Sequence, residues 1–202
     1  METKGNQRRQ ETPGGGMGDE ERFPLGWGDR RVPLHTTVSF YYANETTLDR
    51  ALSFLRVGLD EPGTFCVAVA GPGYDRTLLE ELQRTYRGEL QAVVEEGKLD
   101  VVTDLSSFEA VATAMVERMD RALARGFQRI RALGLVAWGQ PDWLDLAALK
   151  RCEEAANMVA ASYPALIMCV YNVPQLVGEA LGESVEEPTV FINEHREPPP
   201  TA

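Results

Sequence analysis

Two kinds of hydrophobic pattern alternate along most of the chain. Short apolar runs rich in β-branched and aromatic residues predict strands over residues 35–42, 64–70, 130–138, 165–171 and 189–193. Between them apolar residues recur every three or four positions, which predicts helices over residues 45–59, 74–86, 106–126 and 145–163. This alternation favours right-handed crossovers and a three-layer α/β fold, in which helices flank a mostly parallel sheet.

Shorter segments complete the pattern. Residues 89–94 and 98–103 are predicted to be short edge strands, and residues 173–184 a short helix. The longest helix is expected to begin at a serine cap and to end at Gly126, because a C-terminal glycine accepts the left-handed backbone that closes many helices.

Both ends of the chain lack sustained apolar periodicity. Residues 1–32 contain the stretch GGGMGDEER and are predicted to form a disordered or loosely attached leader. Residues 195–202 form a Pro-rich tail, which cannot continue a helix or a central strand. We therefore expect a single domain over residues 33–194 of the 202-residue chain.

The charge balance narrows the class of partner. Thirty-one acidic and 20 basic residues give a formal net charge of -11, which disfavours nucleic acid because phosphate contacts need Lys or Arg. No apolar run approaches the roughly 18 residues that span a bilayer, and no apolar stretch follows the basic N-terminus as a secretory signal requires. The expected location is the cytoplasm, without membrane or nucleic-acid partners.

Residues that carry catalytic or metal chemistry are scarce. Cys66, Cys152 and Cys169 are widely spaced, which argues against a disulfide framework and a zinc site. Only His35 and His195 are present, and no Ser-His-Asp or Cys-His arrangement is visible. The sequence thus predicts no catalytic residue, no metal, no cofactor and no enzymatic activity.

Residues 70–77, AGPGYDRT, have the strand–loop–helix context of a phosphate-binding loop. Asp75 occupies the position of the second glycine and Arg76 that of the lysine. A carboxylate there repels phosphate by about 4 kcal/mol for unit charges 4 Å apart at an effective dielectric of 20. The strand that would supply a magnesium-binding aspartate ends in Trp138 instead. We interpret the loop as degenerate and expect no ATP hydrolysis.

A candidate ligand site follows from the carboxyl ends of the strands, where open α/β sheets bind their ligands. Glycines there allow close backbone approach, and aromatic rings supply apolar walls. The predicted cleft is mainly aromatic and suits a small, apolar or neutral ligand. Its candidate residues are Tyr42, Gly71, Gly73, Arg76, Trp138 and Tyr171.

Glu153 and Asn157 are four residues apart and share one helix face. If that face meets the sheet, the carboxylate needs a partner and a ligand pocket would explain it; a solvated face without function is the alternative. Tyr171 and Cys169 alternate onto one side of their strand, where core packing is the simpler explanation. His35 lies at the opposite strand end, where we expect a structural hydrogen bond.

From His35 to about Asn193 the chain resembles the MEDS family of sensory domains. CEEAAN is similar to the family pattern Tyr-Glu-x-x-x-Asn, and CVYN to its strand end Cys-x-Tyr-Asp. Glu153, Asn157, Cys169 and Tyr171 match these patterns, whereas Cys152 and Asn172 depart from them.

This resemblance implies a RecA/KaiC-like fold that has lost its nucleotide machinery. It also implies a sensory or ligand-binding role in signal transduction or transcriptional regulation, with a small organic ligand. Because the chain leaves no room for an output domain, we expect a regulatory protein partner, and a homo-oligomer is compatible with the sequence. A ligand-free interaction scaffold and a residual nucleotide-binding, ATPase-like protein are the alternative functions.

Overall fold

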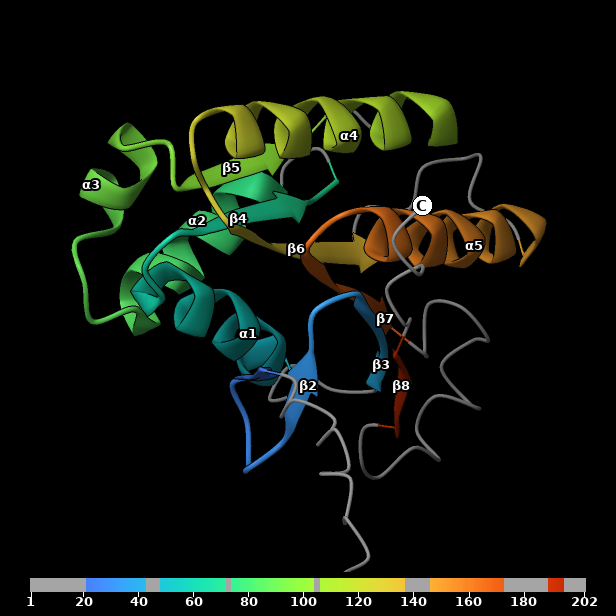
Figure 1. Ribbon diagram of the computed structural model, residues 1–202, viewed down its shortest axis with the longest axis horizontal. Helices are drawn as coiled ribbons and strands as arrows, with labels where there is room; N and C mark the ends of the chain where they lie inside the picture. The colour runs from blue at the N-terminus through green and yellow to red at the C-terminus, as the bar shows by residue number, and fades with distance from the viewer. Residues whose placement is uncertain are drawn as a thin grey trace, which may run out of the picture.

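A computed structural model describes residues 21–42, 48–71, 74–103, 106–136, 146–172 and 189–194. Its main feature is a six-stranded sheet with the strand order β5-β4-β6-β7-β3-β8 (Figure 1). The strands of this sheet are β3 (Thr36–Tyr42), β4 (Thr64–Val69), β5 (Leu99–Val102), β6 (Arg129–Val136), β7 (Ala165–Asn172) and β8 (Thr189–Glu194). All neighbouring pairs are parallel except β3 and β8, which are antiparallel. The predicted α/β fold with a mostly parallel sheet is confirmed.

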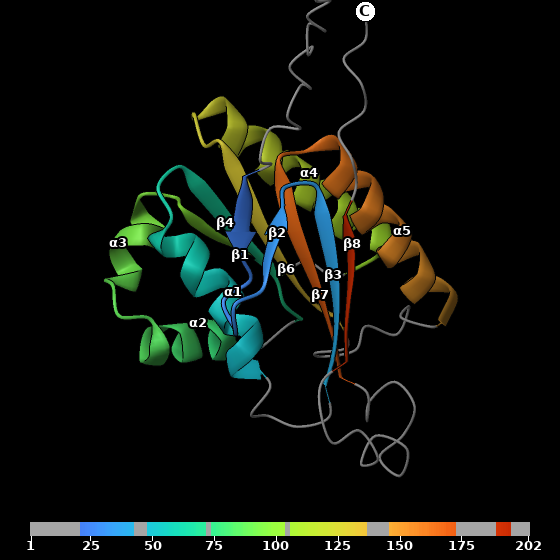
Figure 2. The same cartoon turned by 60° about the horizontal axis from the view of Figure 1, so that its bottom comes forward.

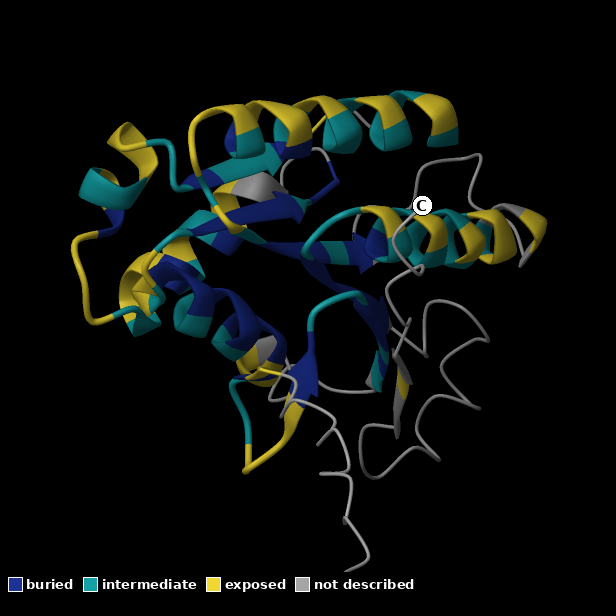
Figure 3. Ribbon diagram, in the orientation of Figure 1, coloured by how far each residue is buried: buried dark blue, intermediate teal, exposed yellow. Residues whose placement is uncertain are grey.

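Helices cover both faces of the sheet, so that the molecule has three layers (Figures 1 and 2). The helices are α1 (Leu48–Asp60), α2 (Tyr74–Thr85), α3 (Leu90–Glu95), α4 (Phe108–Ala124) and α5 (Leu146–Ser162). Helices α1 and α2 bury leucines against one face, and α4 and α5 pack on the other. The central strands are buried on both faces (Figure 3), which explains why their sequences are nearly continuous apolar runs.

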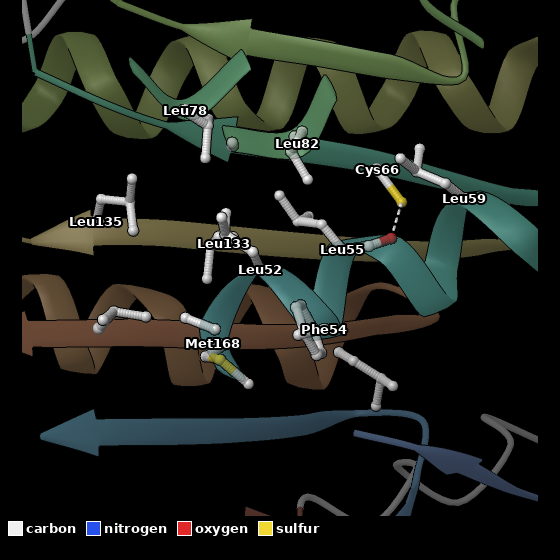
Figure 4. Packing of buried hydrophobic residues seen from close by; sticks show 14 of the residues in the cluster. Leu52, Phe54, Leu55, Leu59, Cys66, Leu78, Leu82, Leu133, Leu135 and Met168 are labelled. Carbon is white, nitrogen blue, oxygen red and sulfur yellow. Dashed lines mark hydrogen bonds between the residues drawn. The ribbon is translucent and has the colours of Figure 1, made fainter. Parts of the chain in front are cut away.

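The core under α1 shows how the helix pattern is used. Leu52, Leu55 and Leu59 recur at helical spacing on the face of α1 that packs on the sheet, where Leu52 lies near Leu133 and Leu59 lies near Cys66 of β4 (Figure 4). All five side chains are buried. The apolar periodicity read from residues 45–59 therefore marks the face that joins α1 to the sheet.

Part of the expected leader is folded. Residues 22–24 and 31–33 form β1 and β2, an antiparallel pair. Phe23 and Val32 of this pair are buried, and Trp27 packs edge-to-face on Phe40 of β3 at 5.6 Å between ring centroids. Strands of three residues are too short to give a periodic signal, so the boundary expected at residue 32 misses this hairpin. Residues 1–20 lie outside the described residues.

Residues 89–94 were predicted to be a strand, and this prediction is wrong. Residues 90–94 lie in α3, because Leu90 and Val93 are three residues apart and place one helix face against the core. Gly97, at a φ of 62°, then turns the chain into β5. The edge strand predicted within residues 98–103 is confirmed as β5.

The caps of α4 agree with the sequence analysis. Ser107 accepts a hydrogen bond from the Ala110 backbone N–H at 3.1 Å, and Gly126 follows the helix with a φ of 94°. The last predicted strand is confirmed as the edge strand β8. The predicted helix over residues 173–184 and the tail over residues 195–202 lie outside the described residues.

Candidate functional site

A row of polar side chains joins β3 to α5. Alternate residues of a strand point to the same face, and β3 directs Thr37, Ser39 and Tyr41 toward the helix. Thr37 donates a hydrogen bond from Oγ1 to Asn157 Oδ1 at 2.6 Å. Ser39 Oγ and Tyr41 Oη both donate to Glu153 Oε1, at 3.4 and 3.1 Å. Glu153 and Asn157 therefore face the sheet, and the alternative of a solvated helix face is wrong.

His35 extends this row at the opposite end of the strand. Its Nδ1 lies 3.0 Å from the backbone oxygen of Ala160, near the end of α5, and its φ is 59°. Because that contact ties the start of β3 to the end of α5, the structural hydrogen bond expected for His35 is confirmed.

Two tyrosines close the row at the carboxyl ends of the strands. Tyr41 and Tyr171 are partners in the parallel register of β3 and β7, and their rings stack at 4.7 Å between centroids with an interplanar angle of 19°. Tyr171 is fully buried in the core under α4 and α5. No group among the described residues meets the distance and angle of a hydrogen bond to its hydroxyl, although the Glu153 carboxylate and the Cys169 thiol lie near it. A buried donor of this kind is uncommon in folded proteins.

Burial raises the pKa of both tyrosine hydroxyls. Burial, followed by the charge of Glu153, raises the pKa of Tyr41 to about 12. Burial also raises the pKa of Tyr171, and the nearby Cys169 thiol and Glu153 carboxylate add to that effect. Burial raises the pKa of Cys169 to about 12. These three groups therefore stay protonated well above neutral pH.

Glu153 has no cationic partner among the residues that the structure describes. Its neighbours in α5 are engaged elsewhere: Lys150 pairs with Glu154 at 3.8 Å on the exposed face, and the Arg151 guanidinium lies 6.0 Å from the centre of the Phe108 ring. The half-buried carboxylate is instead held by the hydroxyls of Ser39 and Tyr41. We call Tyr41, Glu153 and Tyr171, with Ser39, the tyrosine–carboxylate cluster.

The other predicted site residues stand in different places. Gly71 is buried just after β4. Arg76 lies in the first turn of α2, where its side chain is 84% exposed and pairs with Glu80 at 2.8 Å. Because the buried leucines of α2 belong to the core under α1, Arg76 is on the face of the sheet opposite the tyrosine–carboxylate cluster. The structure thus does not bring Arg76 together with Tyr171.

Three predicted positions stay predictions. Gly73 and Trp138 lie outside the described residues, as does the side chain of Tyr42, whose backbone pairs with Asn172 in the sheet. Of the two altered positions in the loop over residues 70–77, the side chain of Asp75 lies outside the described residues, whereas Arg76 is described. The interpretation of that loop as degenerate therefore rests on the sequence.

Sequence reasoning missed the contribution of β3. Polar residues at every second position, from His35 through Thr37 and Ser39 to Tyr41, mark one face of an otherwise apolar strand. In a strand with neighbours on both sides, such a face needs polar partners from the covering layer. This signal predicts the pairing with Glu153 and Asn157 once those two residues are placed on one helix face.

The fold and the cluster together define a class of protein: a parallel α/β domain with a polar cluster at the carboxyl ends of two adjacent strands. Within this class, residues 37–186 match the family model described as MEDS, the methanogen/methylotroph DcmR sensory domain. The chain belongs to the MEDS family.

Other comparisons concern the fold. A KaiC-like protein from the hyperthermophilic archaeon Pyrococcus horikoshii is similar in structure, with a TM-score of 0.55 and 15% sequence identity. The similarity covers 88% of this chain and 90% of the archaeal chain, so the predicted RecA/KaiC-like architecture is confirmed. None of the curated protein sequences gave a significant match.

Two further observations bear on the chemistry. In the described parts of the chain, no helix combines the length and apolar character needed to cross a membrane. Within the same parts, no three His, Cys, Asp or Glu side chains gather closely enough to hold a metal ion.

Proposed function

We propose that this chain is a non-catalytic sensory domain that binds a small organic molecule at the tyrosine–carboxylate cluster and signals through a regulatory protein partner in the cytoplasm. The observation that carries the proposal is the buried Tyr171 hydroxyl without a hydrogen-bond partner in the described chain. Membership of a sensory-domain family supports the same conclusion.

The energetic argument concerns the hydroxyl group. Burying a hydroxyl without a hydrogen bond costs roughly 1–3 kcal/mol. Phenylalanine would fill the same space and stack on Tyr41 without that cost. A hydroxyl kept at position 171 is therefore better explained by a partner that arrives from outside the protein than by packing.

Helix α5 supplies a route for the signal. Its inner face holds the cluster through Glu153 and is tied along β3 by Asn157. Its outer face is open to partners, since Met158 is 66% exposed. A ligand that competes for the hydrogen bonds of Glu153 would shift α5 relative to β3, and a protein bound to the outer face would sense that shift.

Native mass spectrometry of the chain purified from its own host tests this function. The expected result is a small-molecule adduct on the wild-type chain that is lost in Tyr171→Phe. Tyr163→Phe is the matched control, because the Tyr163 hydroxyl already binds exposed Asp120 at 2.8 Å. If the wild type carries no adduct and gains none from the small-molecule fraction of host extract, the ligand-free scaffold replaces the sensor. A nucleotide adduct would instead favour the ATPase-like alternative.

A further inference from the structure

We propose that the ligand of the tyrosine–carboxylate cluster is a small organic cation, an ammonium compound whose N–H groups bind Glu153 and the hydroxyl oxygen of Tyr171. This inference rests on the proposed function and names its ligand class. It differs from the neutral or apolar ligand that the strand-end aromatic residues suggested in the sequence.

The charge at the cluster is the first reason. Glu153 is half-buried, accepts hydrogen bonds from the neutral hydroxyls of Ser39 and Tyr41, lies near the Tyr171 hydroxyl, and has no ion pair in the described chain. A carboxylate withdrawn from water is stabilised most by a cation that can also donate hydrogen bonds. Since Lys150 and Arg151 of the same helix are engaged elsewhere, that cation is expected to come from the ligand.

The geometry of the cluster supplies the second reason. An ammonium group has three or fewer N–H donors and no acceptor, so it needs a site composed of acceptors. Glu153 provides carboxylate oxygens, and the Tyr171 hydroxyl oxygen has no partner in the described chain. The stacked rings of Tyr41 and Tyr171 lie beside these acceptors, and tyrosine rings attract cations as well as alkyl groups. A neutral apolar molecule would supply neither a counter-charge to the carboxylate nor a donor to the Tyr171 hydroxyl oxygen.

Titration of the full chain with matched probes tests the charge. The probes are linear alkylamines of one to five carbons, which are protonated at pH 7, and the alcohols and carboxylates of equal chain length. Binding is followed by calorimetry and by NMR shifts in β3 and α5. We expect at least one alkylammonium ion to bind about ten-fold or more tightly than its alcohol, and the carboxylates to bind most weakly.

Variants locate the effect. Glu153→Gln keeps the size and the acceptor oxygen for Ser39 and Tyr41 but removes the charge, so it should abolish the preference for the amine over the alcohol. Glu154→Gln, one residue along on the exposed face, should leave that preference unchanged. Tyr171→Phe should weaken amine binding several-fold, and it provides a second test if Glu153→Gln does not fold.

The outcomes separate this inference from the proposed function. Alcohols that bind as tightly as the amines, or equal losses in Glu153→Gln and Glu154→Gln, would overturn the cationic ligand and leave the sensor in place. If no amine binds but the host-derived adduct is present and depends on Tyr171, the ligand class is wrong and the function stands. If neither is found, both proposals fail.

Discussion

In the described part of this protein, two polar clusters between helix and sheet differ in how completely their hydrogen bonds are made. One lies under α1 at the amino ends of the strands, around Arg131 and Glu61. The other is the tyrosine–carboxylate cluster, which lies under α5 at the carboxyl ends. Both place a carboxylate against aromatic rings, but only the first includes a positive charge from the protein itself.

The cluster under α1 is complete. Arg131 is 1% exposed and donates from Nε and Nη2 to the two oxygens of Glu61 at 3.1 and 2.7 Å. Its Nη1 donates to the Phe54 backbone oxygen at 3.4 Å, and its guanidinium lies 5.0 Å from the centre of the Phe54 ring. Thr64 adds a hydrogen bond to Glu61 at 3.3 Å. Because the Glu61 charge and its hydrogen bonds are satisfied by groups of the protein itself, this cluster stabilises the fold.

The contrast indicates where function lies. The Tyr171 hydroxyl and the Glu153 charge have no matching donor or cation in the described chain. Natural proteins satisfy nearly all buried polar groups, so the exceptions are candidates for ligand contacts. Variants in the cluster around Arg131 should therefore lose unfolding free energy. Variants in the tyrosine–carboxylate cluster should instead lose ligand binding.

The largest effect is expected for Arg131→Ala. Removing the guanidinium leaves the Glu61 carboxylate without its buried counter-ion, which typically costs about 3–5 kcal/mol of unfolding free energy. Denaturant unfolding measures this loss. Arg84→Ala, which breaks an exposed pair with Glu81, is the control and should cost less than about 1 kcal/mol. A similar cost for the two variants would contradict a structural role for Arg131.

Gly58→Ala should have the next largest effect. A Cβ at this position in α1 would collide with Arg131 Cδ and lie 2.7 Å from Cys66 Sγ. Such crowding of a packed interior typically costs about 1–3 kcal/mol, although alanine is the better helix former. An unfolding free energy equal to or above that of the wild type would show that α1 does not pack closely on Arg131.

Alkaline pH should lower the free energy of unfolding, because buried thiols in both regions and the half-buried Tyr41 resist deprotonation in the folded state. Burial raises the pKa of Cys66 and Cys169 from 9.0 to about 12 and that of Tyr41 from 10.0 to about 12. The unfolded chain then releases protons at lower pH than the folded chain, so stability is complete below pH 9 and falls between pH 9 and 12.

Denaturant unfolding across this pH range gives the check. Tyr41→Phe should make the decline above pH 10 shallower. Tyr163→Phe should change it less, since the pKa of Tyr163 is raised first by its hydrogen bond to exposed Asp120 and only then by burial. A decline that is the same in all three proteins would show that Glu153 and burial do not act on Tyr41.

The smallest effect on stability is expected for Tyr171→Phe. Because the hydroxyl has no protein partner, its removal should leave the unfolding free energy unchanged or raise it by up to about 1 kcal/mol. The same variant is expected to lose its ligand. A loss of 2 kcal/mol or more on the denaturant scale would show that the hydroxyl is satisfied within the protein, as in the cluster around Arg131.

The sequence predicts the sheet better than the site. Continuous apolar runs such as residues 64–70 and 165–171 give the central strands, because strands covered on both faces need apolar residues at every position. The three-residue strands β1 and β2 and the helix α3 were missed, since short elements depend on tertiary contacts of residues such as Phe23 and Leu90.

At the site, spacing alone placed Glu153 and Asn157 on one helix face, and family patterns pointed to Tyr171. The partners on β3 depend on strand order, which places β3 beside β7 although paired residues such as Thr36 and Leu166 are 130 positions apart in the chain. No local pattern contains that pairing. Likewise, the missing partner of the Tyr171 hydroxyl is a property of the packed interior, and the sequence gives no sign of it.

Hydrogen exchange with and without the small-molecule fraction of host extract tests the central claim most directly. If the tyrosine–carboxylate cluster is completed by a ligand, amide protection should increase in α5 and at the carboxyl ends of β3 and β7, and it should stay the same in α1 around Arg131. The Tyr171→Phe variant should show no such increase. Unchanged protection of α5 in the wild type, or an equal increase in wild type and variant, would contradict the account.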